Sequence, residues 1–217
     1  LLSGFAHDLK TPITSITTFT RLVELDNTQL DEESRQYLDI IRRKTKEIQE
    51  QLSTINEFTQ IDSTPPAFEA LDLCVLLRDF YSGNKPDINV SGVSFELLLQ
   101  DDKPVMIYGD KRKLVSVLQN LVFNAVSFTP EGGTICLCLN QEKEYAILRV
   151  KDTGSGISEE DIPYIFDRLF TNRIHENSNG MGLFIVKSII TEHRGTIEVA
   201  SELGKGTVFT IRLPIMQ

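Results

Sequence analysis

Apolar residues recur at alternating spacings of three and four along two stretches of the first 60 or so residues, a pattern typical of packed α-helices. The first stretch comprises Leu2, Phe5, Leu9, Pro12, Ile16, Phe19 and Val23. The second comprises Leu38, Ile41, Thr45, Ile48, Leu52, Ile55 and Thr59, in which two of the positions are threonine. Turn and N-cap residues lie between them, at 26–28 and 31–33. We therefore expect two antiparallel helices over residues 1–62. Because a two-helix hairpin buries little apolar surface, we expect it to dimerise into a four-helix bundle.

Ser63-Thr64-Pro65-Pro66 interrupts the helical pattern, and we interpret residues 63–68 as a linker. From residue 69 to residue 217, helical and strand patterns are mixed. The expected helices are 71–82, 111–128, 158–170 and 182–193, and the expected strands are 93–99, 104–108, 133–139, 144–151, 196–201 and 206–213. The third and fourth strands form a hairpin around Asn140–Lys143. This grouping predicts an α+β protein whose second domain is a mixed sheet covered on one face by helices.

Charge and cysteine usage narrow the class of protein. A net charge of −9 argues against a nucleic-acid-binding protein, which needs a clustered basic surface. Cys136 and Cys138 are two apart on an expected strand, so they point to the same face and cannot easily form a disulfide. They indicate reduced thiols in the cytoplasm and not a metal site. No apolar run reaches the roughly 20 residues that span a bilayer, and the start without Met indicates a piece of a longer protein.

The first expected helix carries one histidine, His7, two residues beyond Phe5 of the apolar stripe. At about 100° per residue, its imidazole points away from that stripe into solvent. The neighbouring Asp8 can accept a proton from one ring nitrogen and so make the other nitrogen more nucleophilic. Thr11 lies one turn later on the same face, and Pro12 loosens this turn. A surface histidine is usually only solvated, but this one is accessible to a bulky phosphoryl donor.

Three further segments carry residues suited to a nucleotide. Asn120 and Asn124 are four apart on an expected helix, so they share one face, and amide oxygens suit Mg²⁺. The run Asp152-Thr153-Gly154-Ser155-Gly156 follows an apolar strand, where glycines let a ligand approach and the carboxylate can accept from an exocyclic amine. The run Asn179-Gly180-Met181-Gly182-Leu183 opens a helix whose free N–H groups suit phosphate. Each segment alone is a weak signal.

Together these segments resemble the motifs of one family. The run His7-Asp8-Leu9-Lys10-Thr11-Pro12 resembles the phospho-acceptor box H-[ED]-L-[RK]-T-P of sensor histidine kinases. The three other segments resemble, in order, the N, G1 and G2 boxes of the α/β sandwich ATPase fold shared by histidine kinases, gyrase-type topoisomerases, Hsp90 and the MutL proteins. Residues 165–170 resemble the F box of the kinase branch, and the runs 195–197 and 204–207 resemble its closing strands. The resemblance covers essentially the whole chain.

This resemblance implies ATP-dependent autophosphorylation of His7 and transfer of the phosphoryl group to an Asp of a response regulator receiver domain. It implies that Asn124 coordinates Mg²⁺, that Asn120 lies beside the phosphates and that Asp152 binds the adenine amino group. It also implies that Thr11 orients water when the phosphorylated partner is dephosphorylated. The other nucleotide-binding residues that it implies are Gly154, Gly156, Ile157, Phe166, Arg168, Arg173, Gly180, Met181, Gly182 and Leu183, with residues 171–180 as a lid. A homodimer is implied, whose cytoplasmic portion is anchored to the cell membrane through a preceding part.

Some positions depart from the family pattern. Ser127 and Phe128 stand where Lys or Arg followed by Tyr is usual, and Ser178 stands where the first glycine of the G2 box is common. The missing cation predicts weaker ATP affinity or slower autophosphorylation, unless Arg168 or Arg173 compensates.

Two alternatives stay open. An ATP hydrolase of the same fold would not need the exposed face that carries His7. A scaffold could keep the fold without the catalysis, and the serine at position 127 favours that alternative. His193, at a helix end, is expected to offset the negative C-terminal end of the helix dipole and to carry no chemistry.

Overall fold

The computed structural model describes residues 67–100, 103–168, 170 and 180–216, together with short runs between positions 13 and 45. The chain divides into two compact units. One comprises residues 1–65 and 175–179, and the other comprises residues 66–174 and 180–217. The expected boundaries at 1–62, 63–68 and 69–217 stay a prediction. Within the described residues, no helix combines the length and the apolar character needed to cross a bilayer.

In the first unit, the described residues are helical. Thr20 and Thr45 are buried, and their hydroxyls donate to the carbonyls of Ile16 and Ile41, four residues earlier in each case. A threonine therefore fits into an apolar seam without leaving its hydroxyl unpaired. By contrast, Ile16, Val23 and Ile41 of the predicted seams are 42–47% exposed, so apolar surface of the hairpin remains uncovered within a single chain.

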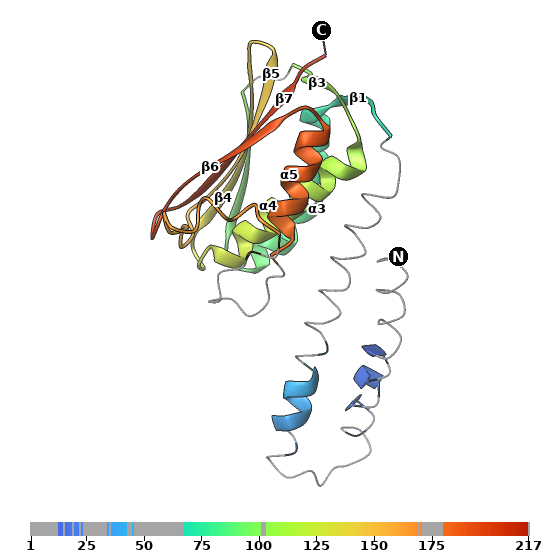
Figure 1. Ribbon diagram of the computed structural model, residues 1–217, viewed down its shortest axis with the longest axis vertical. Helices are drawn as coiled ribbons and strands as arrows, with labels where there is room; N and C mark the ends of the chain where they lie inside the picture. The colour runs from blue at the N-terminus through green and yellow to red at the C-terminus, as the bar shows by residue number, and fades with distance from the viewer. Residues whose placement is uncertain are drawn as a thin grey trace. The chain divides into compact units, whose positions relative to one another are not determined.

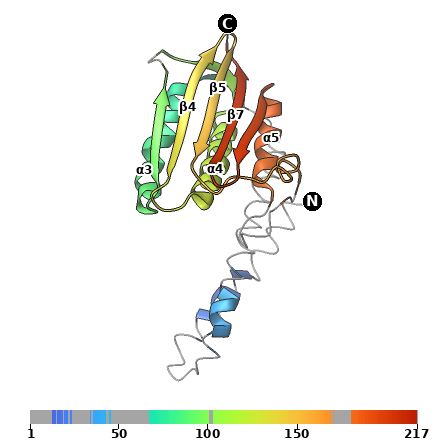
Figure 2. The ribbon, with the colours of Figure 1, turned by 90° about the vertical axis from the view of Figure 1, so that its left-hand side faces the viewer.

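The second unit is a five-stranded mixed sheet with helices on one face (Figures 1 and 2). The strand order is β2-β4-β5-β7-β6, in which only β2 and β4 run parallel. The strands are β2 (Ser94–Leu99), β4 (Thr134–Glu142), β5 (Tyr145–Asp152), β6 (Thr196–Glu202) and β7 (Gly206–Pro214). The helices are α3 (Leu73–Val90), α4 (Lys111–Phe128) and α5 (Gly182–Glu192), and a small separate sheet pairs β1 (Glu69–Asp72) with β3 (Met106–Gly109). The predicted mixed sheet with one helical face is confirmed.

Side chains alternate between the two faces of the sheet. On β4, Ile135, Leu137 and Leu139 are at most 3% exposed and face the helices. The intervening Cys136 and Cys138 lie on the opposite face, which no helix covers in Figure 2. The core therefore sits between the sheet and its helical layer, and α4 contributes three of its most buried side chains, Leu118, Leu121 and Val122.

The expected helix over residues 158–170 was wrong. The N–H groups of Tyr164, Asp167 and Phe170 each donate to the carbonyl three residues earlier, which makes a series of tight turns. Pro163 has no N–H to donate, so it cannot continue an α-helical hydrogen-bond ladder at this point. Apolar spacing alone did not separate these turns from a helix.

Helix α3 is longer than the expected 71–82, because it continues through Pro86 to Val90. The expected end at residue 82 is followed by Gly83-Asn84-Lys85-Pro86, whose glycine and proline are unfavourable in a helix. The amide of Asn84 donates to the carbonyl of Phe80, and Phe80 and Ile88 are both buried. Packing on both sides of the proline therefore outweighs its unfavourable effect on the helix.

The predicted hairpin is present, but its turn is two residues further along the chain. Strand β4 extends to Glu142 and β5 begins at Tyr145, so only Lys143 and Glu144 form the loop. Lys143 has a φ of 54°, in the left-handed region that two-residue hairpin loops use. The polar residues Asn140 and Gln141 belong to the strand because it lies against β5 along its full length.

The structure also corrects the expectation for His193. It is 4% exposed, its Nε2 accepts from the Asp110 N–H at 3.0 Å, and its Nδ1 lies 2.8 Å from the carbonyl of Ile189. Since a carbonyl can only accept, Nδ1 carries the hydrogen and the ring is neutral. Burial lowers the pKa of His193 below 6.5, so it does not offset the helix dipole with a charge. It instead joins α5 to the start of α4, and its ring lies 4.8 Å from that of Phe68.

The lowered pKa of His193 predicts a pH-dependent stability. In the unfolded chain the imidazole takes up a proton as the pH falls below about 6.5, whereas in the fold it resists protonation. We therefore expect the free energy of unfolding to fall below pH 6.5, by at most about 1.4 kcal/mol per pH unit from this group. Urea unfolding between pH 5 and 8 measures this. The variant His193→Gln should have a shallower dependence, and equal slopes in the two proteins would contradict the prediction.

Candidate active site

The predicted asparagine pair lies on one face of α4. Asn120 and Asn124 are both half-buried, and the amide of Asn120 donates to the carbonyl of Ser116 at 2.9 Å. The side-chain oxygen of Asn120 then faces Gly182, the first residue of α5. A Cβ added to Gly182 would lie 2.6 Å from this oxygen. Within the described part of the chain, the side chain of Asn124 makes no hydrogen bond. Neither amide oxygen therefore accepts a hydrogen bond from any of the described residues.

Asp152 ends β5 and is 6% exposed. Its Oδ1 accepts two backbone hydrogen bonds, from the N–H of Gly154 at 2.8 Å and from the N–H of Thr207 at 3.1 Å. Burial raises the pKa of the carboxyl above its ordinary 3.8, although both N–H groups act in the opposite direction. Because one oxygen fixes the side chain in place, the other oxygen, Oδ2, is positioned to accept from a ligand.

The loop after Asp152 is held against the end of α4. The N–H of Ser155 donates to the carbonyl of Phe128 at 3.0 Å, and a Cβ on Gly154 would lie 2.5 Å from the same oxygen. Gly156 has a φ of 71° and lies directly against the backbone of Glu202, where no side chain could fit. The two glycines thus bring the loop, α4 and the β6–β7 turn together.

The start of α5 has no side-chain cap. Its N-cap residue is Met181, which is 3% exposed and makes no capping hydrogen bond, and the preceding Gly180 has a φ of 60°. Helix α5 begins at Gly182, and the N-terminal end of a helix is suited to binding phosphate. Leu183 is half-buried in this first turn.

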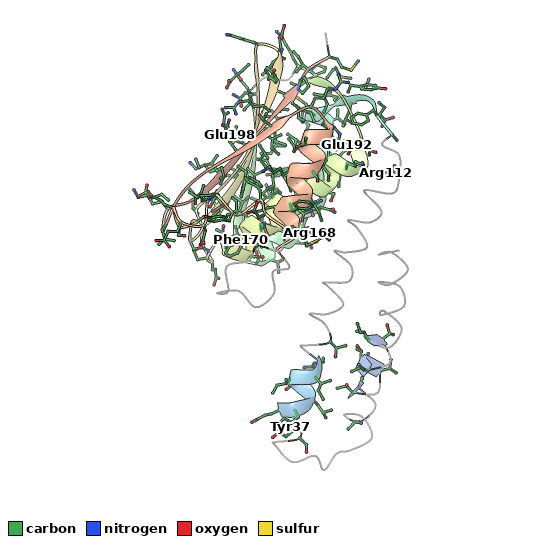
Figure 3. The ribbon with its side chains drawn as sticks, viewed as in Figure 1. Tyr37, Arg112, Arg168, Phe170, Glu192 and Glu198 are labelled. Atoms are coloured by element: carbon green, nitrogen blue, oxygen red, sulfur yellow. The ribbon has the colours of Figure 1, made fainter. Side chains whose placement is uncertain are left out.

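The predicted F box lies beside α5. The ring of Phe166 packs edge-on against Phe209 of β7 at 6.3 Å, and the Nζ of Lys187 lies 5.5 Å above its face. Arg168 is exposed at the end of this segment, where it is labelled in Figure 3 together with Phe170. Phe166 therefore has a packing role, whichever ligand it also meets.

Several predicted residues are not placed by the structure. His7, Asp8, Thr11, Arg173 and all of the expected lid except Gly180 lie outside the described residues.

Sequence reasoning missed three residues that support Asp152. Thr207 donates its N–H to the carboxylate, and Gly206, with a φ of 112°, lies directly against the backbone of Asp152. The hydroxyl of Ser201 accepts from the N–H of Ile157 at 2.8 Å and donates to the carbonyl of Gly206 at 2.9 Å. The Gly204–Thr207 run was visible in the sequence as a turn, but nothing in it indicated a contact with a residue more than 50 positions earlier.

Two protein families match the chain, one over each part of it. Residues 109–217 match the family described as "Histidine kinase-, DNA gyrase B-, and HSP90-like ATPase", and residues 1–64 match the "His Kinase A (phospho-acceptor) domain". Sporulation kinase E of Bacillus subtilis is 32% identical over 220 residues, covering all of this chain and 28% of that protein. The heme sensor protein HssS of Staphylococcus saprophyticus is 30% identical, covering 97% of this chain and 45% of that protein. The chain thus spans less than half the length of these relatives.

A solved structure extends the likeness to three dimensions. The crystal structure of full-length ShkA in complex with AMPPNP is 25% identical with a TM-score of 0.75, covering all of this chain and 46% of that one. Because the ATPase family matches half of the residues, the chain belongs to the histidine kinase-, DNA gyrase B- and HSP90-like ATPases. With the phospho-acceptor domain preceding it, the chain has the two-domain core of a two-component sensor histidine kinase.

Proposed function

We propose that this chain binds Mg·ATP in its α/β unit and transfers the γ-phosphoryl group to His7. The phosphoryl group then passes to an Asp on the receiver domain of a response regulator, and the same core can assist its hydrolysis there. In this proposal residues 1–62 form the phospho-acceptor hairpin, residues 63–68 the linker and residues 69–217 the catalytic domain.

One observation carries the proposal: the fixed carboxylate of Asp152, the amide face of α4 and the uncapped start of α5 adjoin one another in the same unit. The N–H bond from Ser155 to Phe128 links the Asp152 loop to α4, and the contact of Gly182 with Asn120 links α5 to α4. A nucleotide has the matching parts, since its exocyclic amine donates and its phosphates accept. This arrangement supports adenine at Asp152 and phosphates between α4 and α5.

The residues fit a magnesium ion on the phosphates. The side-chain amide of Asn124 has no partner among the described residues and offers a hard, neutral oxygen, which Mg²⁺ accepts as a ligand. When bound there, the ion would offset the charge that develops on the transferred phosphoryl group. Asn120 is then the neighbouring polar contact for the phosphates.

The acceptor is proposed to be His7. A ring nitrogen forms a bond to the γ-phosphorus while the bond from that phosphorus to the bridging oxygen breaks and ADP leaves. Asp8 takes part by accepting a hydrogen bond from the other ring nitrogen, which holds the ring and stabilises the charge that forms on it. Thr11, on the same helical face, is proposed to orient water during dephosphorylation of the receiver.

We further propose that the chain acts as a homodimer in a protein anchored to the membrane. The exposed apolar side chains of Ile16, Val23 and Ile41 support dimerisation, because pairing two hairpins would bury them. The relatives span more than twice the length of this chain, which supports a further part in the whole protein.

Incubation of the chain with γ-labelled ATP tests the proposed function. The expected product is one acid-labile, alkali-stable label per acceptor histidine, which forms only with Mg²⁺. Release of all label as free phosphate would favour the ATP hydrolase instead. Nucleotide binding without any label or phosphate release would favour a scaffold.

The serine at position 127 yields a separate prediction. It is exposed, and its hydroxyl donates to the carbonyl of Phe123 within α4. A lysine there could reach a bound phosphate, so Ser127→Lys is expected to tighten ATP binding by about 0.5–1 kcal/mol, or roughly two- to fivefold. Calorimetry measures this, with Ser127→Gln as the neutral control of similar length. Equal ATP affinity in both variants and the parent would contradict the prediction that the missing cation at position 127 weakens ATP binding.

A further inference from the structure

Cys136 and Cys138 form a close pair of thiols on the uncovered face of the sheet. Their Sγ atoms lie 3.2 Å apart, and both cysteines are free. Strand β4 is hydrogen-bonded on both sides, to β2 and to β5, through this whole region. The backbone that carries the two thiols is therefore fixed, and their spacing belongs to the sheet and not to a flexible loop.

This spacing does not suit a disulfide. A disulfide needs the two sulfurs at about 2.05 Å and the two Cα atoms within about 6.8 Å. Alternate residues of an extended strand are about 6.6–6.8 Å apart, at the limit of that range. Closing the bond would pull the sulfurs together by more than 1 Å against two strand ladders.

The pair does not suit zinc either. Two thiolates on a tetrahedral zinc ion, each at about 2.3 Å, lie about 3.8 Å apart, which is wider than this pair. Structural zinc also needs four ligands, and nowhere in the described chain do three or more His, Cys, Asp or Glu side chains gather in a possible metal site. Burial, together with the neighbouring thiol of Cys138, raises the pKa of Cys136 to about 12, so a thiolate ligand is scarce at neutral pH.

We propose that Cys136 and Cys138 form a bidentate binding site for a trivalent arsenical. Trivalent arsenic binds its ligands in a trigonal pyramid with bond angles near a right angle, so two sulfurs on one arsenic lie closer together than two on tetrahedral zinc. An arsenic atom bound to both sulfurs therefore keeps them close to their present separation of 3.2 Å. Two thiols are sufficient, because the third valence of the arsenic carries its own substituent.

The reaction needs no base and no oxidant. With phenylarsine oxide as the probe, two arsenic–sulfur bonds form and the arsenic–oxygen double bond breaks. Both thiol protons leave with that oxygen as one molecule of water. Arsenic stays trivalent and both sulfurs keep their oxidation state, so protonated thiols are suitable reactants.

The surroundings allow a small reagent to reach the pair. In the sheet register Cys136 lies between Glu96 and Lys151, and Cys138 lies between Leu98 and Arg149. Cys138 is half-buried, so its sulfur is the point of entry, while Cys136 is 9% exposed and supplies the second bond. The site faces away from the helices that carry the candidate active site, and this inference does not depend on the proposed function.

Titration of the intact chain with phenylarsine oxide, followed by mass spectrometry under non-denaturing conditions, tests the site. We expect one phenylarsenic per chain at equimolar reagent, released by excess ethanedithiol but not by a monothiol. Cys138→Ser should weaken binding by about a hundredfold or more, because the second bond is no longer intramolecular. Cys74→Ser is the matched control and should bind like the parent, since Cys74 is a lone buried thiol that donates to the carbonyl of Lys103.

A second measurement separates binding from a fold defect. Phenylarsine oxide should raise the unfolding temperature of the parent and of Cys74→Ser, but not that of Cys138→Ser. Failure of the folded parent to bind would overturn the proposal, and so would binding that survives Cys138→Ser. Ready closure of a Cys136–Cys138 disulfide in oxidised glutathione would contradict the geometric argument.

Discussion

Replacing His7 with Gln is expected to abolish phosphorylation of the chain by ATP while leaving its affinity for ATP unchanged. The imidazole is the proposed nucleophile, and loss of a nucleophile lowers the rate by at least about a thousandfold. Glutamine keeps the polarity and approximate size of the side chain but cannot accept a phosphoryl group at an equivalent nitrogen. Incorporation of γ-label and calorimetric ATP binding, measured on the same preparation, check both parts.

The chain offers a matched control for this variant, because it contains three histidines. His193 is excluded as an acceptor, since it is 4% exposed and both of its ring nitrogens are hydrogen-bonded. The remaining one, His175, falls in the expected lid, and His175→Gln should keep the label. Label that survives in His7→Gln but is lost in His175→Gln would overturn the choice of acceptor.

The helices that were predicted well are those whose local signals agree. Helix α4 covers 111–128 as expected, because Asp110 caps it with bonds to the N–H groups of Arg112 and Lys113 and its apolar residues keep a helical period. Helix α5 likewise begins at Gly182. The turns at 158–170 and the continuation of α3 through Pro86 depend on tertiary packing, which a local pattern does not contain.

The candidate active site, like the helices, has a part that local motifs predict and a part that depends on tertiary contacts. Asn120, Asp152 and Gly182 stand in local motifs, and the structure places Gly182 against the side chain of Asn120. The contacts of Asp152 with Thr207, and of Ile157 with Ser201, join segments more than 40 residues apart through backbone N–H groups. Every residue type except proline has a backbone N–H, so no composition or spacing could have indicated these contacts.

The same bonds to Asp152 make its replacement informative, because they separate a structural role from a binding role. In Asp152→Asn the amide oxygen can take the place of Oδ1 and accept from the N–H groups of Gly154 and Thr207. Since the pKa of Asp152 is raised on folding, the ionised carboxylate opposes folding at neutral pH, and this cost disappears as the pH falls through the raised pKa. The neutral asparagine should therefore be at least as stable as the parent.

Binding of ATP should nevertheless fall steeply in Asp152→Asn. In the variant the amide NH₂ replaces Oδ2, so the adenine amine meets a donor where it had a charged acceptor. The loss of this hydrogen bond costs about 1.5–3 kcal/mol of binding free energy, or roughly 10- to 150-fold in ATP affinity. Calorimetry with ATP and thermal unfolding check the two halves of this prediction, and Asp87→Asn on the exposed side of α3 is the control for the change in charge. The NH₂ can donate to the ring carbonyl of guanine, so the ratio of ATP to GTP affinity should also fall. A stable variant with unchanged ATP affinity would mean that the base binds elsewhere.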